Sequence, residues 1–377
     1  MRIVADENMP GLSLLADHPA VDELIRLDGR TLANVHLQQV DALLVRSVTR
    51  VNANLLAGTP VKFVGSATIG TDHIDLDFLA ERDIHFAHAP GCNARAVAEY
   101  VLQAALLIAE HQQRPLAGRT AGLVGLGNVG RQVARALQAL GMTVVACDPP
   151  LARENAQTCV PLVSLDEALA ADLISLHVPL NRKERDVTWH LLNAARLDAL
   201  HSNQALINTC RGAVVDNGAL LQRLLQPTSP TVVLDVWERE PNVSARLFRE
   251  VLRGSPHIAG YSQQGKLAGT QMVCEALLDW ANLAPLTEPQ AAHDQPLDLP
   301  CTREAELLSL LQQVWSLDRD HQLLADSLSG IDPGKAFDQL RKNYATRHEL
   351  HTFEHHGQVS DQFVPVMDWL FSSPRQA

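Results

Sequence analysis

Short apolar runs recur along most of the chain, and longer stretches with helical spacing or turn residues separate them. This alternation is typical of βα units, which build a parallel sheet with helices on its faces. In the first 95 residues the runs begin at Arg2, Ala42, Val61 and Ile84. We therefore predict an α/β protein whose first part is a flavodoxin-like α/β domain.

A second series of apolar runs follows a long predicted helix over residues 93–112. Its spacing favours a six-stranded, doubly wound parallel sheet of the Rossmann type. We expect this domain to end near His257, where a loop and a helix return the chain to the first domain. The apolar runs of the second series cover residues 121–124, 143–147, 173–178, 205–208 and 231–236.

The last quarter of the chain departs from this repeating pattern. Residues 284–300 are rich in Pro, Ala and Asp, which favours a linker. Helical runs over 304–317 and 335–347 and an apolar run over 363–371 follow. A segment of this size buries little apolar surface by itself, so we predict that it packs on a second subunit. Its apolar contact face would consist of Leu307, Leu308, Leu311 and Val314.

A glycine-rich motif lies between the first two strands of the second series. Gly125, Gly127 and Gly130 follow an apolar strand and open a helix, as in a dinucleotide-binding turn. Asp148 ends the next strand, where an acid suits the ribose hydroxyls of NAD. Because Pro149 and Pro150 follow and no Arg stands beside the acid, we predict NAD rather than NADP as the cofactor.

Three polar side chains follow later strands of the same domain: Arg211, Glu240 and His257. Each taken singly is more often a solvated loop residue. Together they match the needs of hydride transfer from a 2-hydroxy acid. Arg binds a carboxylate through paired hydrogen bonds, His takes the hydroxyl proton, and Glu fixes the His tautomer. The hydride goes to the nicotinamide of the cofactor.

Four further stretches, 173–180, 208–212, 235–241 and 256–260, accompany the glycine motif in order. With it they resemble the D-isomer-specific 2-hydroxyacid dehydrogenases over residues 1 to 283. The resemblance implies that Arg211 binds the substrate, that Glu240 supports the catalytic His and that His257 moves the proton. The NAD contacts that the fingerprint and the resemblance indicate are Gly125, Gly127, Asn128, Val129, Gly130, Asp148, Val178, Thr209, Cys210, Arg211, Asp235 and Gly260.

A closer resemblance within this family lies in residues 6–10, 45–52, 89–94, 147–150 and 340–344. It implies an enzyme of vitamin B6 biosynthesis that oxidises a phosphorylated 2-hydroxy acid. It also implies a homodimer, which the C-terminal domain assembles. A 3-phosphoglycerate dehydrogenase and an NAD-sensing protein without turnover remain the alternatives. We accordingly divide the chain into residues 1–95 with 258–283 for substrate binding, 96–257 for NAD binding, and 284–377 as a small α+β dimerisation domain.

The same resemblance implies substrate contacts from Ser47, Thr68 and Tyr261. We add Arg46 because a substrate with both a carboxylate and a phosphate needs a second cation, and Arg211 serves the carboxylate. Arg46 pairing with a nearby acid such as Asp72 or Asp75 is the competing interpretation. Further basic candidates for the phosphate are Lys266, Arg341 and Lys342.

Composition narrows the classes of partner and compartment. The net charge of −12 argues against nucleic acid or an anionic membrane surface. The six cysteines are scattered without a C-x-x-C pair, as free thiols of a reducing cytoplasm are. No apolar run of about 20 residues predicts a membrane span. We predict no metal site, because His351, Glu354, His355 and His356 show no spacing that fixes coordination geometry.

Overall fold

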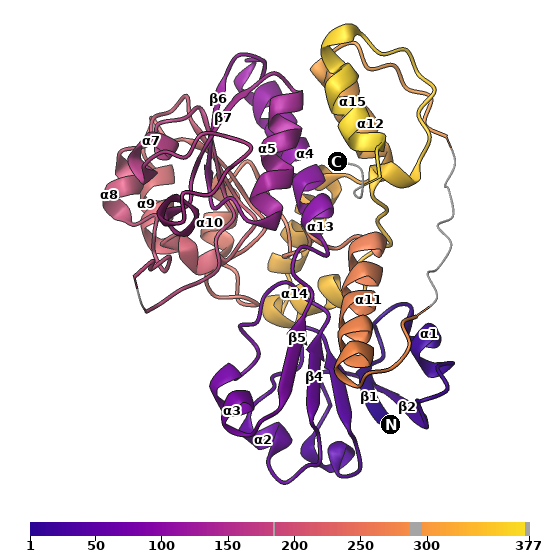
Figure 1. Cartoon of the computed structure of the whole chain (residues 1–377). Coiled ribbons are helices and arrows are strands. Elements are labelled where there is room, and N and C mark those ends of the chain that lie inside the picture. Colours follow the sequence, from indigo (N-terminus) through magenta and orange to yellow (C-terminus); the bar gives the residue numbers. More distant parts are fainter. Residues whose placement is uncertain (184, 287–295, 374–377) are drawn as a thin grey trace. The chain divides into compact units, whose positions relative to one another are not determined.

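The computed structural model describes residues 1–183, 185–286 and 296–373 (Figure 1). The chain divides into two compact units. Unit 1 comprises Met1–Asn93 and the segment that begins at Ser262, and unit 2 comprises Ala94–Tyr261 and the C-terminal segment. Much of the predicted linker lies outside the described residues. The three-domain division stays a prediction, and the units are described separately below.

Unit 1 contains a five-stranded parallel sheet with the order β2-β1-β3-β4-β5, which is the order of the flavodoxin-like fold that the sequence predicts for this part of the chain. The apolar pattern misses the edge strand β2, because its ELIRL sequence is only half-buried and carries charges. Along one face of the sheet, α11 (Gln263–Trp280) packs on β4 and β5. The strands are β1 (Arg2–Asp6), β2 (Glu23–Leu27), β3 (Ala42–Val45), β4 (Phe63–Ser66) and β5 (His85–His88), and the short helices are α1 (Leu12–Ala16), α2 (Ala53–Leu56) and α3 (Leu76–Glu81).

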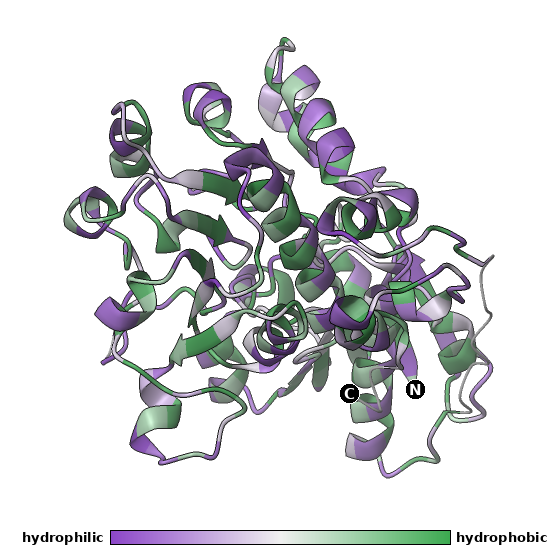
Figure 2. Ribbon diagram, turned by 90° about the horizontal axis from the view of Figure 1, so that it is seen from above, coloured by the Kyte–Doolittle hydropathy of each residue, from purple (hydrophilic) through white to green (hydrophobic). Residues whose placement is uncertain are grey.

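Unit 2 contains the predicted six-stranded parallel sheet, with the order β11-β10-β9-β8-β6-β7. Beyond the edge strand β7, a single parallel bridge joins Ala146 to Leu162. Figure 2 shows strands made mostly of hydrophobic residues and helices that contain both hydrophobic and hydrophilic residues, as expected for amphipathic helices on a buried sheet. The strands are β6 (Thr120–Val124), β7 (Thr143–Cys147), β8 (Leu173–Leu176), β9 (Ala205–Asn208), β10 (Thr231–Leu234) and β11 (Arg253–Gly254).

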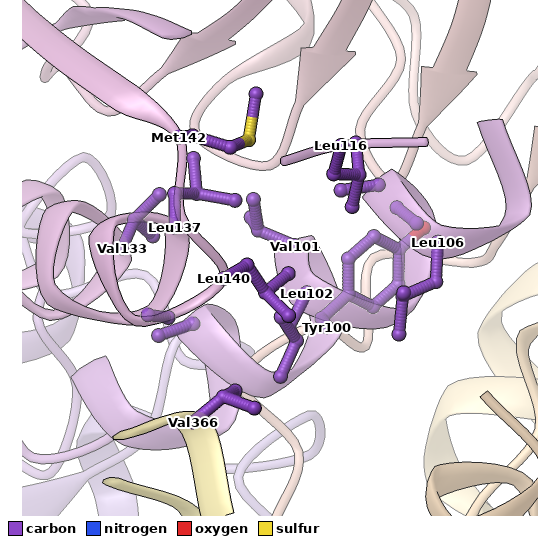
Figure 3. Close-up of a cluster of buried hydrophobic side chains, with 14 of the residues drawn as sticks. Tyr100, Val101, Leu102, Leu106, Leu116, Val133, Leu137, Leu140, Met142 and Val366 are labelled. Atoms are coloured by element: carbon purple, nitrogen blue, oxygen red, sulfur yellow. The ribbon is translucent and has the colours of Figure 1, made fainter. Parts of the chain in front are cut away.

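Two helices form the centre of the unit 2 core. Every residue from Ala94 to Ala109 of α4 (Ala94–Gln112) is buried, and α5 (Asn128–Ala139) packs along it (Figure 3). A helix that is buried all round must be covered on more than one side. The other helices of this unit before the C-terminal segment are α6 (Pro149–Arg153), α7 (Leu165–Leu169), α8 (Ala194–Asp198), α9 (Asn217–Leu224) and α10 (Ala245–Glu250).

The C-terminal segment supplies part of that cover. Helix α12 (Glu304–Val314) packs on α4, and α15 (Val364–Phe371) packs on α5. Leu307, Leu308 and Leu311, predicted to face a second subunit, are at most 4% exposed and belong to the core cluster of this chain. That assignment of the face is wrong, since periodicity reveals an apolar face but not the surface that covers it.

The rest of the C-terminal segment is helical, with α13 (Leu317–Leu328) and α14 (Pro333–Lys342). The predicted helix over 304–317 is broken after Val314, because Ser316 adopts an extended conformation and caps α13. Isolated bridges at Leu297 and Cys301 are the β-structure of this segment among the described residues. None of the described helices combines the length and apolar character needed to cross a lipid bilayer.

Candidate active site

The glycine motif forms the turn between β6 and α5. Gly125 has φ +96°, a value that side chains disfavour. A Cβ at Gly130 would lie 2.2 Å from the carbonyl oxygen of Gly125, so only glycine lets the helix approach the turn this closely. A Cβ at Gly127 would meet nothing within 4 Å, which leaves open space over the start of α5. The turn therefore fits a pyrophosphate on the helix N-terminus.

Asp148 follows β7 and ties this turn to the next helix. Its Oδ2 accepts a hydrogen bond from the backbone N–H of Leu126 at 2.8 Å, and its Oδ1 accepts one from Leu151 at 3.1 Å. A carboxylate has about four lone-pair sites, so acceptor capacity remains for ribose hydroxyls.

The other predicted NAD residues of this sheet follow its strands at their carboxyl ends, where ligands bind in doubly wound folds. The hydroxyl of Thr209 is buried and has no partner among the described residues, which fits a bound polar group. Asn128 and Val129 open α5, Val178 follows β8, Thr209, Cys210 and Arg211 follow β9, Asp235 follows β10, and Gly260 lies on the loop after β11.

His257 and Glu240 meet directly. Nδ1 of His257 lies 2.7 Å from Oε2 of Glu240, while Oε1 of Glu240 accepts the backbone N–H of Trp237 at 2.8 Å. Burial raises the pKa of Glu240, but the charge and hydrogen bond of His257 outweigh it, so the pKa is lowered overall. Nε2 of His257 has no hydrogen-bond partner among the described residues, and the side chain is 31% exposed. One ring nitrogen is thus anchored, and the other is available to a substrate.

Asp235 holds the loop that carries His257. Its carboxylate accepts hydrogen bonds from the hydroxyl of Ser255 and from the backbone N–H groups of Ile258 and Ala259, at 2.6–2.9 Å. The side chain is 1% exposed, so it stabilises the loop from the protein interior. Its predicted contact with NAD stays a prediction.

Arg211 lies on the loop after β9, and this loop packs against the one that carries Glu240. A Cβ at Gly212 would lie 1.9 Å from the backbone carbon of Trp237, so the close approach requires glycine. The amide of Asn208 donates to the carbonyl of Arg211 at 3.0 Å and fixes the start of the loop. Unit 2 therefore brings together the loops of Arg211, Glu240 and His257, as the sequence predicts for a single site.

A second cluster, of His190, Asp216 and Glu238, contacts the same loops, and the sequence pattern did not reveal it. Nε2 of His190 lies 2.7 Å from Glu238, and Nδ1 lies 3.6 Å from Asp216. The three groups could hold a metal ion by proximity. However, the two ring nitrogens face different carboxylates, which is the geometry of an imidazole held between two acceptors.

The predicted substrate residues of unit 1 follow β3 and β4. Nε of Arg46 lies 3.2 Å from Oδ1 of Asp6, so Arg46 has a carboxylate partner, although Asp6 is not one of the acids that the competing interpretation names. The hydroxyl of Thr68 donates to the carbonyl of Gly70 at 2.9 Å, and Ser47 is exposed. Burial and the charge of Arg46 lower the pKa of Lys266, another of the predicted basic candidates.

Tyr261 is the predicted substrate residue of unit 2. Its hydroxyl accepts a hydrogen bond from Nη2 of Arg341 at 3.0 Å. Two histidines of the C-terminal segment have partners of their own: His355 bonds to the carbonyl of Leu299, and His356 lies 3.3 Å from Glu354.

A family model described as "D-isomer specific 2-hydroxyacid dehydrogenase, NAD binding domain" matches residues 95–259. Erythronate-4-phosphate dehydrogenase of Pseudomonas syringae pv. syringae is 44% identical over 359 residues, 93% of each chain. The enzyme of that name from Proteus mirabilis is 43% identical over 355 residues, also 93% of each chain.

Solved structures agree with the fold. The TT0316 protein of Thermus thermophilus superposes with a TM-score of 0.64 at 28% identity and covers 76% of this chain and 98% of its own. D-lactate dehydrogenase of Aquifex aeolicus, solved with NAD and lactic acid, has a TM-score of 0.61 at 23% identity and covers 75% and 96%. The chain belongs to the erythronate-4-phosphate dehydrogenases, a branch of the D-isomer-specific 2-hydroxyacid dehydrogenases that bind NAD.

Proposed function

We propose that this protein oxidises 4-phosphoerythronate (4-phospho-D-erythronate) to 2-oxo-3-hydroxy-4-phosphobutanoate with NAD, in the synthesis of pyridoxal 5′-phosphate. The observation that carries the chemistry is the 2.7 Å contact between His257 and Glu240, on loops packed against that of Arg211. The relatives at 44% identity over 93% of the chain support the choice of substrate, since they carry that name.

In this proposal His257 acts as the general base. Its Nε2 takes the proton of the substrate hydroxyl, and Glu240 holds Nδ1 so that the free nitrogen faces the substrate. The charge of Glu240 also stabilises the imidazolium that forms. Arg211 binds the substrate carboxylate through its planar guanidinium and polarises the reacting carbon. Bound NAD supplies the nicotinamide ring that accepts the hydride.

The residues around the glycine motif hold the cofactor in this scheme. The N–H groups at the start of α5 bind the pyrophosphate over Gly127, where a side chain is absent. Asp148 accepts hydrogen bonds from the adenosine ribose, and its charge repels the 2′-phosphate of NADP. Ser47, Thr68 and Tyr261 are proposed substrate contacts, and Arg46 is proposed as a further substrate contact.

A substrate panel tests the proposed function. We would measure kcat/KM for 4-phosphoerythronate, 3-phosphoglycerate and unphosphorylated erythronate, each with NAD and with NADP. The highest value is expected for 4-phosphoerythronate with NAD. A higher value for 3-phosphoglycerate would support that alternative. NAD binding without turnover of any of these acids would support a sensing protein.

We also propose a homodimer and a cytoplasmic location. The C-terminal segment exposes the large apolar side chains Leu323, Ile331 and Val364, which suit a subunit contact. All six cysteines are free thiols, as in a reducing compartment. Analytical ultracentrifugation of Ile331→Asp tests the first point: a weakened dimer is expected, and an unchanged dimer would place the contact elsewhere.

A further inference from the structure

The C-terminal segment brings one guanidinium to the loop of the proposed base. Arg341, in the last turn of α14, donates from Nη2 to the hydroxyl of Tyr261 at 3.0 Å. Its Cζ lies 5.6 Å from the centre of the Tyr261 ring. Tyr261 follows His257 closely along the chain. Arg341 itself lies far outside the segment that the NAD-binding family model matches, residues 95–259.

Arg341 has hydrogen-bonding capacity that the protein does not use. Its Nε is buried and has no partner among the described residues. A guanidinium presents five N–H donors in a planar fork, and a buried donor without an acceptor destabilises the folded state. The nearby acids already have hydrogen-bond partners. Glu240 contacts His257 and accepts a hydrogen bond from a backbone N–H, and Asp235 accepts hydrogen bonds from the loop after His257. The unused donors therefore suit an external anion.

The charge of Arg341 is permanent in this setting. Burial lowers its pKa, but interactions with Tyr261, Glu240 and Asp235 outweigh that effect, so the pKa is raised overall. No carboxylate of the described residues lies within ion-pair distance of Arg341. A multiply charged oxyanion such as phosphate would supply both the charge and the acceptors that Arg341 lacks.

Helix α14 is fixed relative to the loop of Glu240. A Cβ at Gly334, in its first turn, would lie 2.8 Å from Oδ1 of Asn242, so the helix begins in close contact with the turn after Glu240. One turn later Phe337 is fully buried in the core cluster that also contains Trp237. Arg341 is thus placed by a packed helix rather than by a free loop, which favours a defined role in binding.

We propose, on the basis of the proposed function, that Arg341 contacts the substrate and binds its phosphate group, with Tyr261 holding the guanidinium in place. Arg211 must lie beside the carboxylate and the reacting carbon, so the phosphate at the far end of the molecule needs another cation. Nε is buried without a hydrogen bond in both Arg46 and Arg341, but Arg46 of unit 1 has the carboxylate of Asp6 at 3.2 Å, whereas Arg341 has no ion-pair partner among the described residues.

Steady-state kinetics of Arg341→Gln with 4-phosphoerythronate and with erythronate test this role. For the phosphorylated substrate we expect kcat/KM to fall by about 10- to 100-fold, chiefly because KM rises. This is the usual contribution of hydrogen bonds to a charged group. For erythronate the loss should be much smaller. Arg341→Lys should recover part of the loss, since it keeps the charge without the fork. Equal losses for the two substrates would overturn the proposal.

Lys335→Gln is the matched control, because Lys335 is an exposed cation on the same helix. It should leave both kcat/KM values close to those of the wild type, and a selective loss equal to that of Arg341→Gln would overturn the specific role of Arg341.

Thermal unfolding with and without inorganic phosphate separates this inference from the proposed function. If phosphate raises the Tm of the wild type but not of Arg341→Gln, Arg341 binds phosphate even where 4-phosphoerythronate is not turned over. Equal stabilisation of the two proteins would contradict the inference whatever the substrate.

Discussion

Two histidine–glutamate pairs of unit 2 share one contact distance but use different ring nitrogens and have different surroundings. His257 and His190 each lie 2.7 Å from a glutamate, and both have positive φ, +58° and +48°. Their partners Glu240 and Glu238 lie on one loop. The second nitrogen of His257 has no partner among the described residues, whereas that of His190 faces Asp216 at 3.6 Å. A catalytic base needs one anchored and one available ring nitrogen, as His257 has. His190, with a carboxylate near each nitrogen, instead forms a structural group with Glu238 and Asp216 that we call the clamp.

The clamp supports the loop that carries Arg211. The backbone N–H of His190 donates to the carbonyl of Ala213 at 2.8 Å. Glu238 accepts the N–H of Asn217 at 3.2 Å and donates its own N–H to the Asn217 side chain at 3.1 Å. The His190 cluster therefore links the loop that carries Arg211 to the loop that carries Glu238 and Glu240, and both of its ring nitrogens lie near carboxylates.

The largest effect is expected from His257→Asn. If His257 is the base, kcat should fall by about 10²–10⁴-fold, the usual worth of general acid–base catalysis. NAD binding, measured by fluorescence titration, should change little because the glycine motif is untouched. Near-normal turnover at neutral pH would assign the proton transfer to another residue and remove the distinction between the two pairs.

Glu240→Gln should cause the next largest loss, by at least about tenfold in kcat, or about 1.4 kcal/mol of transition-state stabilisation. The lowered pKa of Glu240 keeps its carboxylate ionised, and that charge favours the imidazolium. Removing it disfavours protonation of the base, so the acid limb of the kcat/KM profile should move to lower pH. The wild-type pair contributes stability above about pH 4.5 that is lost as the pH falls and Glu240 is protonated.

Glu238→Gln provides the control for this shift. It removes the equivalent charge from the other pair, so the acid limb should stay where it is in the wild type. A shift of equal size in Glu238→Gln would mean that the profile reports the general charge of the loop and not the base.

Arg211→Lys tests the proposed carboxylate-binding group, whose loop packs against that of Glu240. Lysine keeps the charge but cannot form the paired hydrogen bonds to a carboxylate, so kcat/KM should fall by about 10- to 100-fold. The pH profile should keep its shape because His257 and Glu240 are unchanged. Wild-type kinetics in this variant would make Arg211 a structural residue of its loop.

The smallest effect is expected from His190→Asn. The lost contacts should cost roughly 1 kcal/mol of stability, which lowers Tm by about 2–4 °C for a unit of this size. Turnover should stay within about tenfold of the wild type, since no reacting atom is touched. Calorimetry and steady-state kinetics on one preparation check both points. A loss of activity as large as that of His257→Asn, without loss of stability, would contradict the clamp.

The sequence by itself indicated most strands of the two sheets, because each apolar run and glycine turn favours its own local conformation. It therefore predicted both parallel sheets, the dinucleotide turn and the polar residues that follow the strands. Arg211, Glu240 and His257 could be predicted to meet, since parallel strands bring their carboxyl ends to one edge of a sheet. The edge strand β2 escaped prediction because its half-buried sequence lacks a clear apolar period.

Only the tertiary structure decided which distant groups became partners. It paired Arg46 with Asp6, set His190 between Asp216 and Glu238, and covered α4 with the leucines of α12 that periodicity had assigned to a second subunit. It also placed Arg341 on Tyr261, 80 positions earlier in the chain. Local patterns specify that a side chain is apolar or charged. The partner that neutralises or covers it depends on how distant elements pack, and no short stretch of sequence carries that information.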